Sequence, residues 1–253
     1  MKENLNSIQA LVLRYTDYGE SDRIVHLLTE EHGLICAMVR GARSAKKKYA
    51  GLIDLGNVLE VKVSPGKGEL WRLHDANTKR SVLRIRSNIY KLALLSYACE
   101  LCSHAIQVES PEPKIFGLML HLVQLLEEFD EGFGARFRMA FELKLLTFAG
   151  YMPQIERCQS CGHALGEDAV IFPVEGATFH AKCLPVMSNP EKNTYTCTPV
   201  WRNAAQLSLR TPLRESIGSS MPEGPQWAFS HIFSLKMQKK LNAREFLRTL
   251  ENS

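Results

Sequence analysis

Four potential metal ligands, three cysteines and one histidine, have the spacing of a zinc site. They follow the pattern C-x2-C-x18-H-x2-C and are Cys158, Cys161, His180 and Cys183. Two residues between paired ligands allow a tight turn that directs both side chains toward one ion. Because the protein fills all four positions, the pattern predicts a structural Zn²⁺ and not a catalytic one. The alternatives are that Cys197 replaces His180 as a ligand, or that the four residues align by chance.

A second group of residues could bind nucleic acid. The cations and the tyrosine that follows them are Arg40, Arg43, Lys46, Lys47, Lys48 and Tyr49. Their segment also contains Gly and Ser, which predicts a loop whose cations contact phosphates. Tyr15, Tyr18 and Trp71 supply further rings on which the bases of a single strand could stack. The alternative is a solvated basic loop with its aromatic neighbours packed in the core.

Known catalytic patterns do not occur in the sequence. There is no G-x-x-x-x-G-K-[ST], no H-E-x-x-H, no G-x-S-x-G and no H-x-E before the C-x-x-C pair. A second C-x-x-C, at Cys99 and Cys102, shares its helix face with Leu92 and Ile106, which favours packing over metal or redox chemistry. We therefore expect a protein that is not an enzyme and that has no small-molecule substrate.

The composition indicates a globular protein, because 45% of its 253 residues are hydrophobic. Residues 1–8 lack an apolar targeting segment, and no later stretch is long and apolar enough to span a membrane. The 7 cysteines, an odd number, fit a reducing compartment better than a disulfide framework. We expect a cytoplasmic protein without a membrane partner.

The net charge of +4 is distributed unevenly. Residues 1–91 carry 16 Lys and Arg against 10 Asp and Glu, residues 92–200 carry 7 against 13, and residues 201–253 carry 8 against 4. Basic ends are compatible with a polyanionic partner, because phosphate contacts dominate the affinity of nucleic-acid-binding proteins. A solvated basic face is the alternative.

Hydrophobic patterning changes from strand-like to helical along the chain. Partial alternation predicts strands at 8–15, 23–29, 33–40, 52–63 and 69–74. Such a run of short strands favours a small closed β-barrel, because closure removes exposed sheet edges. A 3.6-residue period predicts helices that begin near 88, after the break at 110–113 and at about 134, and again after Thr198-Pro199 and from Trp227.

These elements predict a multidomain α+β protein. We expect a β-barrel at residues 1–80 and the first part of a helical domain at 81–154. A four-ligand, zinc-finger-like segment is expected as an insertion at 155–196, and the C-terminal part of the helical domain at 197–253.

Several segments together resemble the RecO family of recombination mediators. The N-terminal segments are 10–14, 18–22, 28–33 and 39–43. The C-x-x-C-G cluster at 158–162, Phe172, Gly176, the H-x-x-C pair and the segment 241–247 follow in the order found in that family. Family members usually have a fourth cysteine where this chain has His180.

The resemblance implies that the barrel is an OB-fold that binds single- and double-stranded DNA. The predicted DNA-binding residues are then Arg14, Arg40, Arg43, Lys46, Lys47, Lys48 and Tyr49. It also implies a role in DNA repair by the RecF pathway, in the bacterial cytoplasm at the nucleoid. There the protein would anneal complementary strands coated by single-strand binding protein and, with RecR, help to load RecA.

A further implied partner is the acidic, aromatic-ended tail of single-strand binding protein. The apolar residues of 115–129 and 137–148 are expected either to offer a groove for that tail or to close the core. The residues by themselves are compatible with two other functions. One is an RNA-binding OB-fold zinc protein of translation or transcription. The other is an enzyme with a catalytic zinc, against which the four-ligand count argues.

Overall fold

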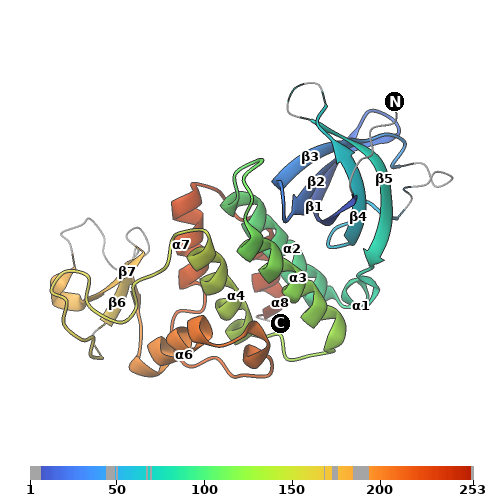
Figure 1. Cartoon of the computed structure of the whole chain (residues 1–253). Coiled ribbons are helices and arrows are strands. Elements are labelled where there is room, and N and C mark those ends of the chain that lie inside the picture. Colours follow the sequence, from blue (N-terminus) through green and yellow to red (C-terminus); the bar gives the residue numbers. More distant parts are fainter. Residues whose placement is uncertain are drawn as a thin grey trace. The chain divides into compact units, whose positions relative to one another are not determined.

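The computed structural model describes residues 7–43, 49, 51–66, 68, 70–167, 169–172, 176–184 and 194–251 (Figure 1). The chain divides into two compact units, Met1–Glu128 and Phe129–Ser253. The first contains a five-stranded barrel followed by helices, and the second contains helices and a three-stranded sheet. The expected α+β class with an N-terminal barrel is confirmed, whereas the bounds of the four segments given above stay a prediction.

The barrel strands are β1 (Ser7–Tyr18), β2 (Asp22–Thr29), β3 (Gly33–Val39), β4 (Val58–Ser64) and β5 (Trp71–Arg80). Their spatial order is β1-β2-β3-β5-β4, and the barrel closes where β4 pairs with β1. Neighbouring strands are antiparallel except β3 and β5, which run parallel. This is a closed OB-like barrel, whose closure satisfies the backbone groups that an open edge would leave unpaired.

Aliphatic side chains at alternate positions fill the barrel. They include Ala10, Val12, Val25, Leu27, Ile35, Ala37, Leu59 and Val61. The strand expected at 52–63 begins only at Val58, because Gly51 and Gly56 adopt left-handed conformations with φ of 72° and 80°. The last strand extends beyond its expected end at His74, to Arg80.

The first unit continues with α1 (Leu83–Arg86), α2 (Ile89–Ala105) and α3 (Pro113–Glu128). The side chain of Asn88 caps α2 by accepting a hydrogen bond from the backbone N–H of Lys91 at 3.1 Å. Cys99 and Cys102 are buried in this helix, and burial raises the pKa of Cys99 to about 12. The interpretation of this pair as packing cysteines is confirmed.

Gly33 lies where the barrel contacts the segment between α2 and α3. Its φ is 63°, and a Cβ at this position would collide with the backbone carbonyl of Ser110. Beside it, the backbone N–H of Glu109 donates to the carbonyl of Leu34 at 2.9 Å. Glycine is therefore required here for its conformation and for its lack of a side chain.

The second unit contains α4 (Ala135–Phe148), α6 (Pro199–Arg210), α7 (Ala228–Met237) and α8 (Asn242–Glu251), with short helices η1 (Ala181–Cys183) and η2 (Leu213–Ser216). Its sheet has the order β7 (Ala177–His180), β6 (Ala169–Phe172), β8 (Tyr195–Thr196). Thr198 caps α6 as expected, accepting a hydrogen bond from the N–H of Trp201. Among the described residues, none of the helices is long and apolar enough to cross a membrane.

A buried arginine connects the helices of the second unit. Arg138 on α4 donates to Glu142 at 3.0 Å and binds both carboxylate oxygens of Glu251, at 2.9 and 3.1 Å. Its guanidinium carbon lies 3.5 Å from the ring centroid of Trp227. These contacts satisfy the buried charge and attach the end of α8 to α4, because an unpaired charge in this position would be strongly destabilising.

Replacing Gly33 should destabilise the first unit far more than replacing a glycine of similar conformation. Gly33→Ala should lower the free energy of unfolding by more than about 2 kcal/mol. The left-handed backbone strains an alanine, and its Cβ would also collide with the carbonyl of Ser110. The control is Gly19→Ala, with φ 60° and no atom within 4 Å of an added Cβ, which should lose about 1 kcal/mol. Urea denaturation measures the free energy of unfolding of both variants. Equal losses of stability would show that the contact with Ser110 is unimportant.

Candidate functional sites

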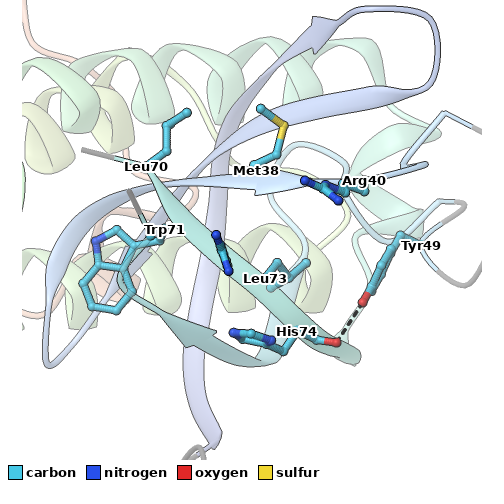
Figure 2. Close-up of a pocket in the computed structure, with 9 residues that line it drawn as sticks. Met38, Arg40, Tyr49, Leu70, Trp71, Leu73 and His74 are labelled. Carbon is cyan, nitrogen blue, oxygen red and sulfur yellow. Dashed lines mark hydrogen bonds between the residues drawn. The ribbon is translucent and has the colours of Figure 1, made fainter. Parts of the chain in front are cut away.

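A groove of about 580 Å³ lies on the barrel beside β3 and β5 (Figure 2). It combines cationic, aromatic and apolar side chains, and its lining residues are Met38, Arg40, Tyr49, Gly66, Leu70, Trp71, Arg72, Leu73 and His74. The parallel register places Ala37 beside Trp71 and Met38 beside Arg72. Pairing of β3 with β5 thus joins cations and rings from distant parts of the sequence in one concave surface.

The aromatic side chains of the groove are held in place by hydrogen bonds. The hydroxyl of Tyr49 donates to the backbone carbonyl of His74 at 3.1 Å (Figure 2). The indole N–H of Trp71 donates to the carboxylate of Glu109 at 2.6 Å, and the ring of His32 packs 5.0 Å from the indole. Rings that are already oriented lose little freedom when a base stacks on them.

The structure brings together some of the residues predicted to bind DNA. Arg40 and Tyr49 line the groove. Arg14 is exposed on β1 but is not one of the lining residues. Lys46, Lys47 and Lys48 lie outside the described residues. The DNA-binding role of all these residues stays a prediction.

Arg43 has partners elsewhere on the barrel. Its guanidinium donates to the carbonyl of Gly19 at 3.1 Å and lies 3.4 Å from the carboxylate of Asp17. These contacts stabilise the turn between β1 and β2. The guanidinium of Arg43 therefore lies against the β1–β2 hairpin.

Sequence reasoning missed Arg72 and His74 as residues of the groove. Both are exposed, and they alternate with Trp71 and Leu73 along β5. Period-2 alternation in the predicted strand 69–74 was the signal that could have found them. That pattern does not predict which strand pairs with β3.

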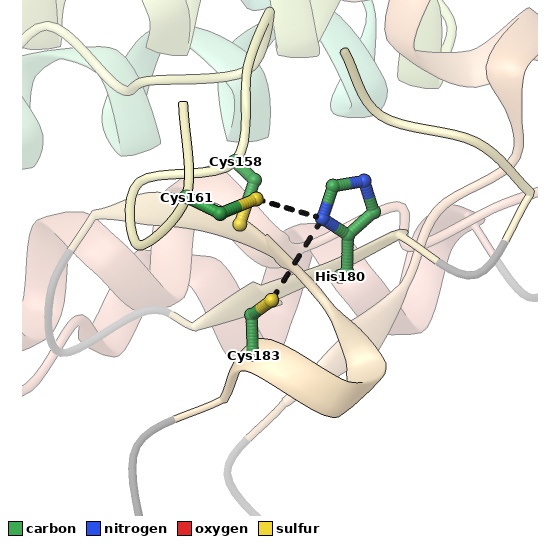
Figure 3. Close-up of side chains that lie close together, drawn as sticks. All are labelled: Cys158, Cys161, His180 and Cys183. Atoms are coloured by element: carbon green, nitrogen blue, oxygen red, sulfur yellow. Dashed lines mark hydrogen bonds between the residues drawn. The ribbon is translucent and has the colours of Figure 1, made fainter. Parts of the chain in front are cut away.

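The four predicted metal ligands converge in the second unit (Figure 3). The Sγ atoms of Cys158, Cys161 and Cys183 and a ring nitrogen of His180 all lie within 4.8 Å of one another. Soft sulfur and imidazole donors at this separation suit a tetrahedral Zn²⁺. Cys197 is not a member of this cluster; its thiol donates to the carbonyl of Ala169 at 3.4 Å.

Local backbone geometry orients these four side chains toward one another. The N–H of Gly162 donates to the carbonyl of Cys158 at 2.8 Å, and its φ of 73° closes the turn between the first two cysteines. His180 ends β7, and the short helix η1 places Cys183 one turn later. Nε2 of His180 lies 3.0 Å from the carbonyl of Ala164, which can only accept, so Nδ1 carries the lone pair that faces the sulfurs.

The cluster favours a thiolate even without a neighbouring cation. Burial alone would raise the pKa of Cys158, but backbone hydrogen bonds from Cys161, His180 and Ser160 outweigh it and lower the pKa to about 6. Burial and the nearby thiols of Cys161 and Cys158 raise the pKa of Cys183. Thiolates this close together repel one another. A divalent cation would offset this repulsion, because it stabilises each thiolate.

A third site is a pocket of about 420 Å³ in the second unit that contains a buried cation. Arg136 on α4 is only 7% exposed, and its Nη1 has no hydrogen-bond partner among the described residues. Burial lowers the pKa of Arg136, the effect expected when a cation loses water without gaining a counter-ion. Asn203, Leu207 and Ser220 also line the pocket. An anion bound here would supply the missing partner.

Most of the apolar side chains of 115–129 and 137–148 lie in the core. Ile115, Met119, Leu122, Phe137 and Phe141 are completely buried. Side chains without exposed surface cannot line a groove, so the interpretation that these residues close the core is confirmed.

Comparisons with known proteins identify two family regions. Residues 1–82 match the family described as "Recombination protein O N terminal", and residues 86–197 match "Recombination protein O C terminal". The first match ends just after β5 and thus contains the whole barrel. The second includes all four residues of the cysteine and histidine cluster.

Curated relatives agree with these matches. A protein of Myxococcus xanthus named DNA repair protein RecO is 37% identical over 62% of this chain, which corresponds to 64% of the relative, less than two thirds of its length. A protein of that name from Anaeromyxobacter sp. (strain K) is 36% identical over 70% of each chain. One from Dehalococcoides mccartyi (strain ATCC BAA-2266 / KCTC 15142 / 195) is 33% identical over 79% of this chain and 75% of the relative. The chain therefore belongs to the RecO family of DNA repair proteins.

Proposed function

We propose that this chain is a recombination mediator of the RecF pathway that has no catalytic activity of its own. It binds single- and double-stranded DNA and anneals complementary strands coated by single-strand binding protein. With RecR it then helps to load RecA. The observation that carries the proposal is the barrel groove, where Arg40 and Arg72 accompany the rings of Tyr49 and Trp71.

Such a groove suits annealing because it holds a strand without reading its sequence. Cations neutralise phosphates, and each base stacked on an aromatic ring contributes about 1–3 kcal/mol whatever its identity. Duplex formation releases about 1.4 kcal/mol per base step, so pairing can displace loosely held strands without ATP. The relatives described above are named as DNA repair proteins, which gives no support to the alternative of an RNA-binding protein.

A structural zinc ion completes the proposal. Cys158, Cys161, His180 and Cys183 would hold it, and the four protein ligands would leave no position for water or substrate. The ion would supply folding energy to the segment around it and no chemistry.

The pocket of Arg136 is the proposed site for the tail of single-strand binding protein. A peptide carboxylate matches the planar guanidinium of Arg136 and would satisfy its buried charge. Leu207, which is 54% exposed, offers an apolar surface in the same lining to a neighbouring side chain of the peptide. Glu215 is a carboxylate of that lining, but it is exposed and can turn to solvent.

The double variant Arg40→Gln/Arg72→Gln should weaken binding of a single strand and reduce its salt dependence. Two lost phosphate contacts should lower the slope of log affinity against log salt by about 1.4, since each contributes about 0.7. Fluorescence anisotropy with a labelled thymidine oligonucleotide measures the slope. The control Lys114→Gln/Arg210→Gln removes two exposed cations elsewhere and should change little. An unchanged slope in the groove variant would place the DNA elsewhere.

Purified protein should contain one zinc ion per chain, and Cys161→Ser should lose it. Metal analysis by mass spectrometry measures the content, and Cys36→Ser, which alters a barrel cysteine, is the matched control. Loss of the ion should increase hydrogen exchange within 155–184 and leave exchange in β1–β5 unchanged, because the ion stabilises its own segment. Zinc retained by Cys161→Ser would contradict the assignment.

Arg136→Gln should weaken binding of a synthetic tail peptide at least tenfold. Removing the cation of a buried ion pair costs about 2–5 kcal/mol, and the remaining attraction should be less sensitive to salt. Calorimetric titration of the full chain measures the affinity. The same peptide with an amidated C-terminus should bind the parent protein weakly. If the amidated and free peptides bind equally well, Arg136 does not recognise the terminal carboxylate.

A further inference from the structure

A separate cationic cavity of about 190 Å³ lies near the C-terminal end of the second unit. Tyr195 of β8, Trp227 before α7 and His231 of α7 form its aromatic part, and Arg244 and Arg248 of α8 form its cationic part. The two arginines are four residues apart, so they lie on one face of the helix. Neither the barrel groove nor the pocket of Arg136 shares a residue with this cavity.

The charges of the cavity are unbalanced. Among the described residues, its lining contains two guanidinium groups and no carboxylate. Arg244 pairs with Glu245 at 3.1 Å and lies 3.4 Å from the hydroxyl of Ser230, which orients it. Arg248 is exposed and makes no ion pair within the described part of the chain. The two arginines therefore leave a net positive charge on the lining of the cavity.

The aromatic groups of the cavity are rigid. The hydroxyl of Tyr195 lies 3.0 Å from Nδ1 of His231, and the two rings meet edge to face. Arg138 covers one face of Trp227, whose ring still forms part of the cavity wall. Burial and then the charge of Arg244 lower the pKa of His231, so the imidazole is neutral and acts as a hydrogen-bonding group at neutral pH.

Two kinds of anionic ligand could contact such a lining, an acidic peptide tail or a nucleotide. The tail of single-strand binding protein is already assigned to the pocket of Arg136, which has Leu207 in its lining, whereas the described lining here contains only aromatic and cationic side chains. A nucleotide needs cations for its phosphate and a flat ring for its base, and the cavity offers both. Paired guanidinium groups also match the oxygens of a phosphate.

We infer that this cavity binds a nucleotide of single-stranded DNA, with the phosphate on Arg244 and Arg248 and the base against Tyr195 or Trp227. The inference rests on the proposed function, because it assumes that the chain binds DNA. It deepens that function, since a strand contact in each of the two units would let one molecule hold two strands, or two parts of one strand, during annealing.

The salt dependence of binding tests the role of the two arginines. In the full chain, Arg244→Gln/Arg248→Gln should lower the log–log slope for a thymidine oligonucleotide by about 1.4, as two lost phosphate contacts require. Arg244→Lys/Arg248→Lys keeps the charge and should keep the slope, which separates lost charge from damaged folding. The inference is overturned if the glutamine variant behaves like the control Lys114→Gln/Arg210→Gln, or if the lysine variant loses the slope as well.

Photocrosslinking then locates the strand. An oligonucleotide that carries 5-iododeoxyuridine should form adducts in peptides that contain Tyr195 or Trp227, in addition to any on the barrel. Adducts confined to residues 7–80 would overturn this inference and leave the proposed function intact. If the full chain does not bind the oligonucleotide and no adduct forms anywhere, the proposed DNA binding itself fails.

Discussion

The parallel pairing of β3 with β5 is the interaction on which the candidate DNA groove depends. Without it, Arg40 would follow one strand and Trp71 would begin another with nothing to place them together. The pairing also completes the strand order that lets β4 return to β1 and close the barrel. A packed aliphatic core inside the barrel keeps this geometry stiff, so the surface can hold a strand without first being ordered by it.

In the second unit, two buried arginines of α4 have different surroundings. Arg138 is buried but fully occupied by carboxylates and an aromatic ring, so it stabilises the helices. Arg136, two residues away on the same helix, is buried and lines a pocket, and its Nη1 has no hydrogen-bond partner in the described part of the chain. The contrast between the two arginines separates a structural charge from one that is available to a partner.

Much of this organisation could be predicted from local patterns. The ligand spacing of Cys158 to Cys183 depends on two short turns, and period-2 and period-3.6 patterning gave most strands and helices. The late start of β4 could not be predicted, because it depends on left-handed glycines among apolar residues. The roles of Arg72 and Arg136 depend on which distant residues lie beside them, and a single sequence does not contain that information.

Strand annealing tests the central claim most directly. Two complementary oligonucleotides are coated with single-strand binding protein, and duplex formation is followed by fluorescence without ATP. The full chain should accelerate annealing, and Arg40→Gln/Arg72→Gln should abolish most of the acceleration. An annealing rate equal to that without the protein, or an undiminished rate with the variant, would contradict the claim.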